Sequence, residues 1–225
     1  MITWIHRVLT GPLLFPELAD ENGLVAIGGD LRPERLLEAY CRGVFPWFDD
    51  TMPILWWSPD PRAIFELDNP DSFYVSRRLR RTLRSGRFAV TIDRDFSAVI
   101  RGCADRPGEG NWITPEMIAA YERLHRLGHA HSVEAWRLGM LAGGVYGVGI
   151  RGFFAGESMF SRSSDASKVA LAFLIDHLRT RGFRLFDIQF LNDHTQRLGA
   201  IEIPRADYLE RLRHALRAPV TFAEG

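Results

Sequence analysis

The sequence predicts a mixed α+β fold in two parts: a small amino-terminal α/β domain, then a larger domain in which helices flank a mixed sheet. Segments with helical spacing of apolar residues alternate with strand-like segments along the chain. A proline-rich stretch at residues 58–61 interrupts this pattern early. The 225 residues, 46% hydrophobic and 12% aromatic, can bury a core without a disulfide or a structural metal.

The amino-terminal domain should contain one short helix between turn-rich, aromatic stretches. Asp30 can cap this helix, Pro33 lies in its first turn, and Gly43 ends it. The stretch from Ser58 to Pro61 can continue neither a helix nor a central strand. We therefore place a domain boundary after residue 62, which assigns residues 1–62 to the small domain and 63–225 to the larger one.

The larger domain should contain both element types in irregular order, and either an α+β or an α/β arrangement fits the pattern. Thr114 and Pro115 begin one helix, Gly128 ends it, and Ser164 or Asp165 caps a later one. Gly139 is expected to turn a hairpin. The other expected helices lie near residues 76–84, 96–104 and 207–216, and the strands near 88–92, 132–138, 141–150, 152–160 and 184–190.

Charge and cysteine content narrow the class of protein. The 28 basic and 28 acidic side chains give a formal net charge of zero, which argues against nonspecific coating of nucleic acid. Cys41 and Cys103 lack CxxC spacing, and His129 and His131 have no evident third ligand, so we predict no metal site. No signal peptide and no apolar run of about 20 residues is evident, so a soluble, cytoplasmic protein is predicted.

A carboxylate and an amide lie two residues apart on the strand expected at 184–190. Because side chains alternate along a strand, Asp187 and Gln189 should share one face, and Phe186, Ile188 and Phe190 the other. A buried carboxylate needs partners, so the pair is either a satisfied structural network or a catalytic site.

A second candidate centres on Glu157, which aromatic residues and Met159 flank directly before a predicted helix. The amino terminus of that helix could offer backbone NH groups to an anion. The alternative is an ordinary core in which Glu157 pairs with Arg162.

Two further features suit nucleic acid. Arg77, Arg80, Arg81 and Arg84 fall on one face of a predicted helix, which is either a phosphate-binding surface or simply a solvated face. Trp47 and Trp112 lie beside Pro and Gly in loops, where an indole can stack on an unpaired base or act as a core plug or lid.

These residues lie in segments that make the chain resemble the leucyl/phenylalanyl-tRNA-protein transferase family over nearly its whole length. The segments are 22–30, 43–48, 56–62, 112–114, 129–136, 156–162, 166–168, 187–189, 192–195, 198–200 and 203–205. The resemblance implies a larger domain with a GNAT-type acyltransferase fold. It also implies transfer of Leu, Phe or Met from aminoacyl-tRNA to proteins with amino-terminal Arg or Lys, which marks them for degradation by the N-end rule.

The resemblance also implies roles for individual residues. Asp187 and Gln189 match the catalytic pair, and Trp47 and Trp112 match the aromatics that hold the terminal adenosine. Residues matching the aminoacyl site are Phe154, Glu157, Met159 and Ser161, and those matching the tRNA contacts are Arg77, Arg81 and Arg84. Val145 departs from the family pattern, because a relative has Met there in the amino-acid pocket.

An aminoacyl ester is already activated, so the implied reaction needs no ATP, metal or acetyl-CoA, and we predict no cofactor and a monomeric enzyme. Asp187 would orient and polarise Gln189, whose carbonyl oxygen would accept a hydrogen bond from the incoming amine. Two other functions remain open. An acyl-CoA N-acetyltransferase should have a Q/RxxGxG/A loop, which residues 161–165 do not form, and a noncatalytic tRNA-binding module would leave Asp187 and Gln189 without a role.

Overall fold

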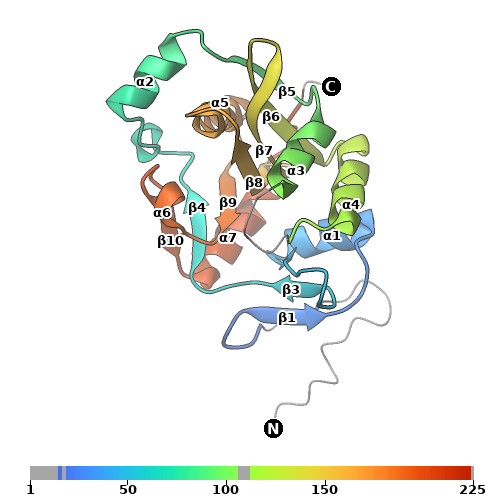
Figure 1. Cartoon of the computed structure of the whole chain (residues 1–225). Coiled ribbons are helices and arrows are strands. Elements are labelled where there is room, and N and C mark those ends of the chain that lie inside the picture. Colours follow the sequence, from blue (N-terminus) through green and yellow to red (C-terminus); the bar gives the residue numbers. More distant parts are fainter. Residues whose placement is uncertain (1–14, 17–18, 106–111, 224–225) are drawn as a thin grey trace.

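The structure is a computed structural model of the chain that describes residues 15–16, 19–105 and 112–223. It contains two sheets with helices packed against them (Figure 1). Apart from Phe15, the amino-terminal segment in which we predict no signal peptide lies outside the described residues, as do Gly110 and Asn111. Within the described ranges, no helix is long and apolar enough to cross a membrane.

The smaller sheet is antiparallel, with strand order β1-β3-β2. Its strands are β1 (Leu24–Ile27), β2 (Phe45–Pro46) and β3 (Leu55–Trp57), and helix α1 (Pro33–Cys41) connects β1 to β2. The expected cap at Asp30 is wrong. Because α1 begins at Pro33, Arg32 holds the cap position, and the Asp30 carboxylate instead accepts from the Arg32 backbone and binds the Arg35 guanidinium at 3.3 Å. Gly43 ends the helical segment with a φ of +72°, a conformation that suits glycine.

The larger sheet has the order β10-β4-β9-β8-β7-β6-β5 and is antiparallel except where β8 pairs with β9. Its strands are β4 (Arg62–Phe65), β5 (Ala89–Ile92), β6 (Ala130–Arg137), β7 (Met140–Ile150), β8 (Phe153–Ser161), β9 (Leu185–Gln189) and β10 (Ile201–Ile203). This mixed sheet, with the small sheet before it, confirms the predicted α+β class.

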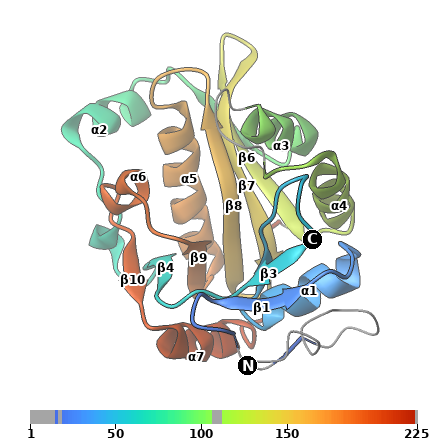
Figure 2. The same cartoon turned by 60° about the horizontal axis from the view of Figure 1, so that its bottom comes forward.

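Helices cover both faces of the larger sheet (Figure 2). Helix α5 (Ala166–Arg181) packs on one face, and α3 (Phe96–Ala104) and α4 (Pro115–Arg126) pack with α1 and α7 (Arg205–Ala215) on the other. Shorter elements are η2 (Pro70–Ser72), α2 (Arg77–Arg84) and α6 (Asp193–Gln196). Asp165 takes the predicted cap position of α5 but makes no capping bond, because its carboxylate binds Arg78 and Lys168 instead.

The boundary after residue 62 remains a proposal. Strand β3 belongs to the small sheet and β4, which begins at Arg62, to the large one. The two parts nevertheless share one hydrophobic cluster, which includes Trp56 of β3 together with Tyr121 and Tyr146 of the larger part. Any unfolding of the small part therefore exposes core residues of the large one.

Candidate active site

A pocket of about 200 Å³ opens where the parallel strands β8 and β9 separate. The two strands pair from Phe153 opposite Leu185 to Ala155 opposite Asp187, where the ladder ends. The pocket is lined by Phe65, Trp112, Val145, Gly156, Glu157, Ser158, Met159, Leu171, Phe186, Ile188, Phe190, Asn192 and Thr195. A larger cavity of about 650 Å³ between α1, β1 and α7 contains none of the predicted site residues in its lining, so we assign the chemistry to the smaller pocket.

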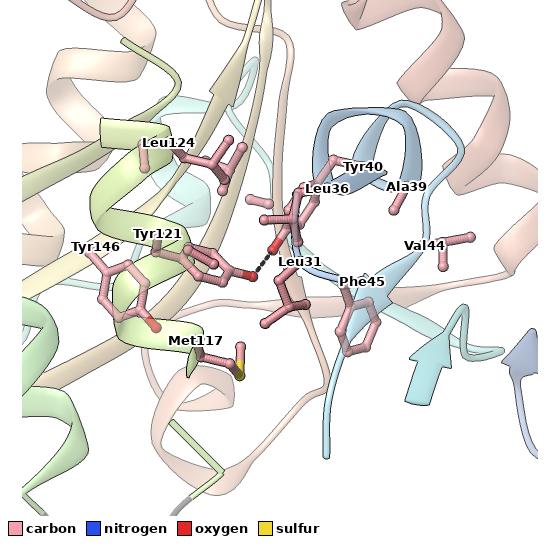
Figure 3. Packing of buried hydrophobic residues seen from close by; sticks show 14 of the residues in the cluster. Leu31, Leu36, Ala39, Tyr40, Val44, Phe45, Met117, Tyr121, Leu124 and Tyr146 are labelled. Atoms are coloured by element: carbon pink, nitrogen blue, oxygen red, sulfur yellow. Dashed lines mark hydrogen bonds between the residues drawn. The ribbon is translucent and has the colours of Figure 1, made fainter. Parts of the chain in front are cut away.

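Glu157 enters this site through a β-bulge. Tyr146 of β7 pairs with Ser158 and the next residue, Gly147, pairs with Gly156, so Glu157 is the extra residue of β8. The Tyr40 hydroxyl donates to one carboxylate oxygen at 2.8 Å, and the Tyr121 hydroxyl approaches the other at 3.3 Å. Figure 3 shows the two tyrosines, from α1 and α4, pointing toward one another and joined by a hydrogen bond.

The environment of Glu157 favours its protonated form. Burial raises the pKa of this carboxyl from its ordinary 4.5 to about 7, against the opposing effect of the bonds from Tyr40 and Tyr121. The nearby Asp187 charge raises this pKa further, whereas Arg62 lowers it. Burial also raises the pKa of both tyrosines well above the usual range, so they are hydrogen-bond donors at neutral pH. Glu157 can therefore take up and release a proton near pH 7.

Asp187 is fully buried and has four hydrogen-bond donors. The Arg62 guanidinium binds both of its oxygens, with Nε 2.9 Å from Oδ1 and Nη2 2.6 Å from Oδ2. The Tyr208 hydroxyl donates to Oδ2 at 3.1 Å, and the backbone NH of Gln189 donates to Oδ1 at 2.9 Å. Asp187 thus contacts Gln189 through the main chain and not, as expected from the sequence, through the side-chain amide.

Gln189 departs from strand geometry. Its φ is +61°, in the left-handed region that is costly for a residue other than glycine, so the alternation predicted for β9 does not extend to it. Phe186, Ile188 and Phe190 do line the pocket together. When the Gln189 amide is oriented to satisfy its neighbours, Nε2 donates to the carbonyls of Ile188 (3.1 Å) and Gly156 (2.9 Å). This bond to Gly156 bridges β9 and β8 just past their last pair, and it leaves Oε1 as an acceptor.

The structure brings together some of the other predicted site residues and separates the rest. Trp112 and Met159 line the pocket, and Trp47, 44% exposed, packs against Phe190 of the lining with ring centroids 5.6 Å apart. Phe154 is buried outside the lining and packs behind Phe186 at 5.7 Å. Ser161 is exposed at the end of β8, where its hydroxyl donates to the Ser163 carbonyl and accepts from the Ser167 NH of α5, outside the pocket lining. Because Trp47 and Trp112 are the side chains predicted to hold the terminal adenosine, we call this pair the nucleoside clamp.

The predicted tRNA contacts lie on α2. Arg77, Arg81 and Arg84, called the basic triplet below, are exposed, and within the described part of the chain none of them forms an ion pair. Ser76 caps α2 with a bond to the Leu79 NH, and Leu79 is buried beneath the arginines. The alternative pairing of Glu157 with Arg162 is wrong, because Arg162 lies over the Phe160 ring and 3.9 Å from Asp105.

Four side chains at the site were not predicted from the sequence: Tyr40, Tyr121, Arg62 and Tyr208. Arg62 ends one of the segments that carry the family resemblance, which was a usable signal, but Tyr40 and Tyr121 look like ordinary apolar-face residues of helices. Only the bulge at Glu157 directs a carboxylate toward them. Among the described residues, no group of three or more His, Cys, Asp and Glu side chains could hold a metal ion.

Comparisons with known proteins agree on one family. The family model described as "Leucyl/phenylalanyl-tRNA protein transferase" matches residues 67–213, and a model of the corresponding amino-terminal domain matches residues 29–60. A leucyl/phenylalanyl-tRNA–protein transferase of Anaeromyxobacter sp. (strain K) is 55% identical over 207 residues, which is 91% of this chain and 88% of the relative. The protein of that name from Stutzerimonas stutzeri (strain A1501) is 50% identical over 97% of both chains.

Solved structures give only distant likenesses. L-PGS from Bacillus licheniformis has a TM-score of 0.38 and 15% identity over 72% of this chain and 52% of its own. A tandem GNAT protein from the clavulanic acid biosynthesis pathway has a TM-score of 0.37 and 13% identity over 85% of this chain and 59% of its own.

Proposed function

The chain belongs to the leucyl/phenylalanyl-tRNA protein transferase family, and from this membership we propose that it transfers Leu, Phe or Met from aminoacyl-tRNA to proteins whose amino-terminal residue is Arg or Lys. The product is a new peptide bond at the acceptor's α-amino group. We further propose that the enzyme acts as a monomer in the cytoplasm and that the added residue marks the acceptor for N-end-rule degradation.

The pocket between β8 and β9 is the observation that carries this proposal. Its volume of about 200 Å³ falls below the roughly 300–1,000 Å³ typical of cofactor sites, so it suits one amino-acid side chain. Val145, Met159, Leu171 and Phe186 make much of its wall apolar, which favours Leu, Phe and Met over charged residues. Glu157 lies in the same lining, and Gln189 bonds to the carbonyls of two lining residues.

The donor tRNA would be held at two places. Of the nucleoside clamp, Trp112 lines the pocket and Trp47 packs on Phe190 of the lining. The two indoles would stack on the terminal adenine and bring the ester carbonyl over Glu157. The basic triplet is exposed on α2 and suits the phosphates of the acceptor stem, which it would bind without reading sequence.

The reaction requires two proton transfers from the acceptor's ammonium group. We infer that Glu157 takes the first, since its pKa of about 7 suits a base that works near neutrality. The free amine then attacks the ester carbonyl while Gln189 Oε1 accepts one of its hydrogen bonds, which holds the nitrogen lone pair toward the carbon. As the new C–N bond forms and the ester C–O bond breaks, the second proton passes to the leaving 3′-oxygen, with the ribose 2′-hydroxyl as its carrier.

The roles proposed for Asp187 and Gln189 differ from those of the catalytic pair that the family resemblance implies. An amide is hardly basic, so Gln189 orients the amine rather than deprotonating it. Asp187 is held by an arginine, a tyrosine hydroxyl and a backbone NH, and its contact with Gln189 is through the main chain. We therefore assign Asp187 to positioning and Glu157 to proton transfer.

A transfer assay tests the proposal. Labelled Phe-tRNA or Leu-tRNA is mixed with the protein and a peptide that begins with Arg, and the expected result is label in the peptide. The same peptide with an acetylated amino terminus should receive none, because the nucleophile is the α-amine. Transfer from acetyl-CoA in place of aminoacyl-tRNA would identify an N-acetyltransferase, and tRNA binding without any transfer would identify a binding module; either result would overturn the proposal.

A further inference from the structure

We propose that Arg62 is a positioning residue of the transfer reaction, which fixes the Gln189 amide relative to the nucleoside clamp. This inference deepens the proposed function and rests on it. The inference follows from the place of Arg62 in the fold. Arg62 is the first residue of β4, and its side chain is only 1% exposed. It contacts Asp187 of β9 on one side and the segment that leads into β2 of the small sheet on the other.

The contact with the catalytic strand runs through Asp187. Both carboxylate oxygens accept from the Arg62 guanidinium, which holds the carboxylate in one orientation. Oδ1 also accepts the backbone NH of Gln189 at 2.9 Å. That bond stabilises the left-handed backbone of Gln189, whose φ of +61° needs support from its surroundings. Arg62 therefore acts on Gln189 through Asp187.

The contact with the small sheet runs through the turn that leads to Trp47. Arg62 Nη1 donates to the carbonyl of Gly43 at 3.0 Å, and the guanidinium lies 4.8 Å from the centroid of the Phe45 ring. Phe45 in turn packs on Phe190, the residue after Gln189, with ring centroids 5.8 Å apart. One side chain thus holds together the segment that leads to Trp47 of the clamp and the strand that carries the Gln189 amide.

The geometry requires arginine rather than any cation. The guanidinium carbon lies 4.8 Å from the centroid of the Phe45 ring and 4.4 Å from that of the Tyr208 ring. Its NH groups donate to the Asp187 carboxylate and, in a different direction, to the Gly43 carbonyl. A lysine ammonium could keep the charge but could not bind both carboxylate oxygens in the same plane and reach Gly43 as well.

Steady-state transfer by Arg62 variants tests the inference, with aminoacyl-adenosine as well as full aminoacyl-tRNA as donor. Arg62→Lys should lower kcat at least about tenfold with both donors, because the acceptor amine is no longer held. Arg62→Met alone leaves the Asp187 carboxylate without its cationic partner, so Arg62→Met combined with Asp187→Asn provides a variant that lacks both charges of this pair. This double variant should recover thermal stability while its kcat stays low. A kcat that returns with the stability would reduce Arg62 to a structural residue and overturn the inference.

Two readouts separate positioning from folding. Dilute guanidinium should partly restore kcat in Arg62→Ala, an effect opposite to its action as a denaturant. The groups that act on the Glu157 carboxyl are Arg62, Asp187, Tyr40 and Tyr121, and Arg62 lowers its pKa. Because Arg62→Lys weakens this effect of Arg62, the protonated carboxyl is favoured and the pH midpoint of kcat should rise. A midpoint and kcat equal to wild type would contradict the inference.

The matched control is Arg179→Met. Arg179 of α5 binds the carbonyls of Leu67 and Asn69 and the Ser72 hydroxyl, a set of polar partners that includes no residue of β9. This variant should lose stability and keep wild-type kcat and pH midpoint. If no variant or wild-type protein transfers an amino acid, the proposed function has failed; if wild type transfers and the Arg62 variants do so equally well, only this inference has failed.

Discussion

Replacing Glu157 with Gln should stabilise the protein at alkaline pH and at the same time lower its activity. Burial raises the pKa of Glu157 from 4.5 to about 7, so the charged form is disfavoured in the folded state. The stability that the protonated carboxyl contributes is complete below pH 4.5 and is lost as the pH rises through about 7. The difference between these pKa values corresponds to about 3 kcal/mol, at about 1.4 kcal/mol per tenfold change in proton affinity.

Glutamine avoids this cost because it is neutral at every pH and keeps both tyrosine contacts. Its oxygen can accept from Tyr40, and its NH₂ group can donate to the Tyr121 hydroxyl. The variant should therefore match wild type near pH 4.5 and exceed it by up to about 3 kcal/mol in the free energy of unfolding above about pH 8. Transfer should fall by about two to four orders of magnitude, since the base is gone.

Urea unfolding at both ends of this pH range, with transfer measured on the same samples, is the assay. Glu202→Gln on β10 serves as the control, because Glu202 is exposed and its replacement should leave stability and transfer nearly unchanged. The reasoning is refuted if Glu157→Gln shifts stability equally at all pH values, or if it transfers at the wild-type rate near pH 8.

Three further predictions concern substrate binding. Alanine at either position of the nucleoside clamp should raise KM for aminoacyl-tRNA and for aminoacyl-adenosine alike, by the equivalent of roughly 1–3 kcal/mol of stacking; an effect on full tRNA alone would place the tryptophans on the stem. Reversal of the basic triplet to Glu should weaken binding of every donor tRNA and flatten the salt dependence by about 0.9 in logarithmic slope per lost phosphate contact, and an unchanged slope would make α2 a solvated face. Val145→Met should shrink the pocket and shift preference from Phe toward Leu in a competition assay, whereas an unchanged ratio would remove Val145 from the specificity pocket.

Local sequence signals predicted the elements well wherever one residue type fixes the backbone. Thr114 caps α4 as expected, and the positive φ of Gly128 and Gly139 fits the helix end and the hairpin turn expected there. The predicted cap at Asp30 was wrong because its carboxylate accepts from the backbone NH of Arg32, which lies before the first helical residue. A capping residue is recognised by its place directly before the helix, which the sequence gives only to within a few residues.

The catalytic geometry was less predictable because it depends on departures from regular structure. Strand alternation correctly placed Phe186, Ile188 and Phe190 together but could not foresee the left-handed Gln189. The bulge at Glu157 depends on the register between β7 and β8, which is a nonlocal property. Tyr40 binds Glu157 and Arg62 binds Asp187 from elements that are distant in sequence. Local sequence patterns do not predict contacts of this kind.

Single-turnover transfer by Gln189→Ala is the most direct test of the proposed mechanism. Gln189 is a better target than Asp187, because Asp187→Asn would leave the buried Arg62 charge without its partner, at a cost of about 3–5 kcal/mol. With aminoacyl-adenosine and an Arg-starting peptide, the variant should bind the donor normally and transfer about two to four orders of magnitude more slowly than wild type. Transfer at the wild-type rate by a folded Gln189→Ala protein would contradict the proposal that this amide orients the attacking amine.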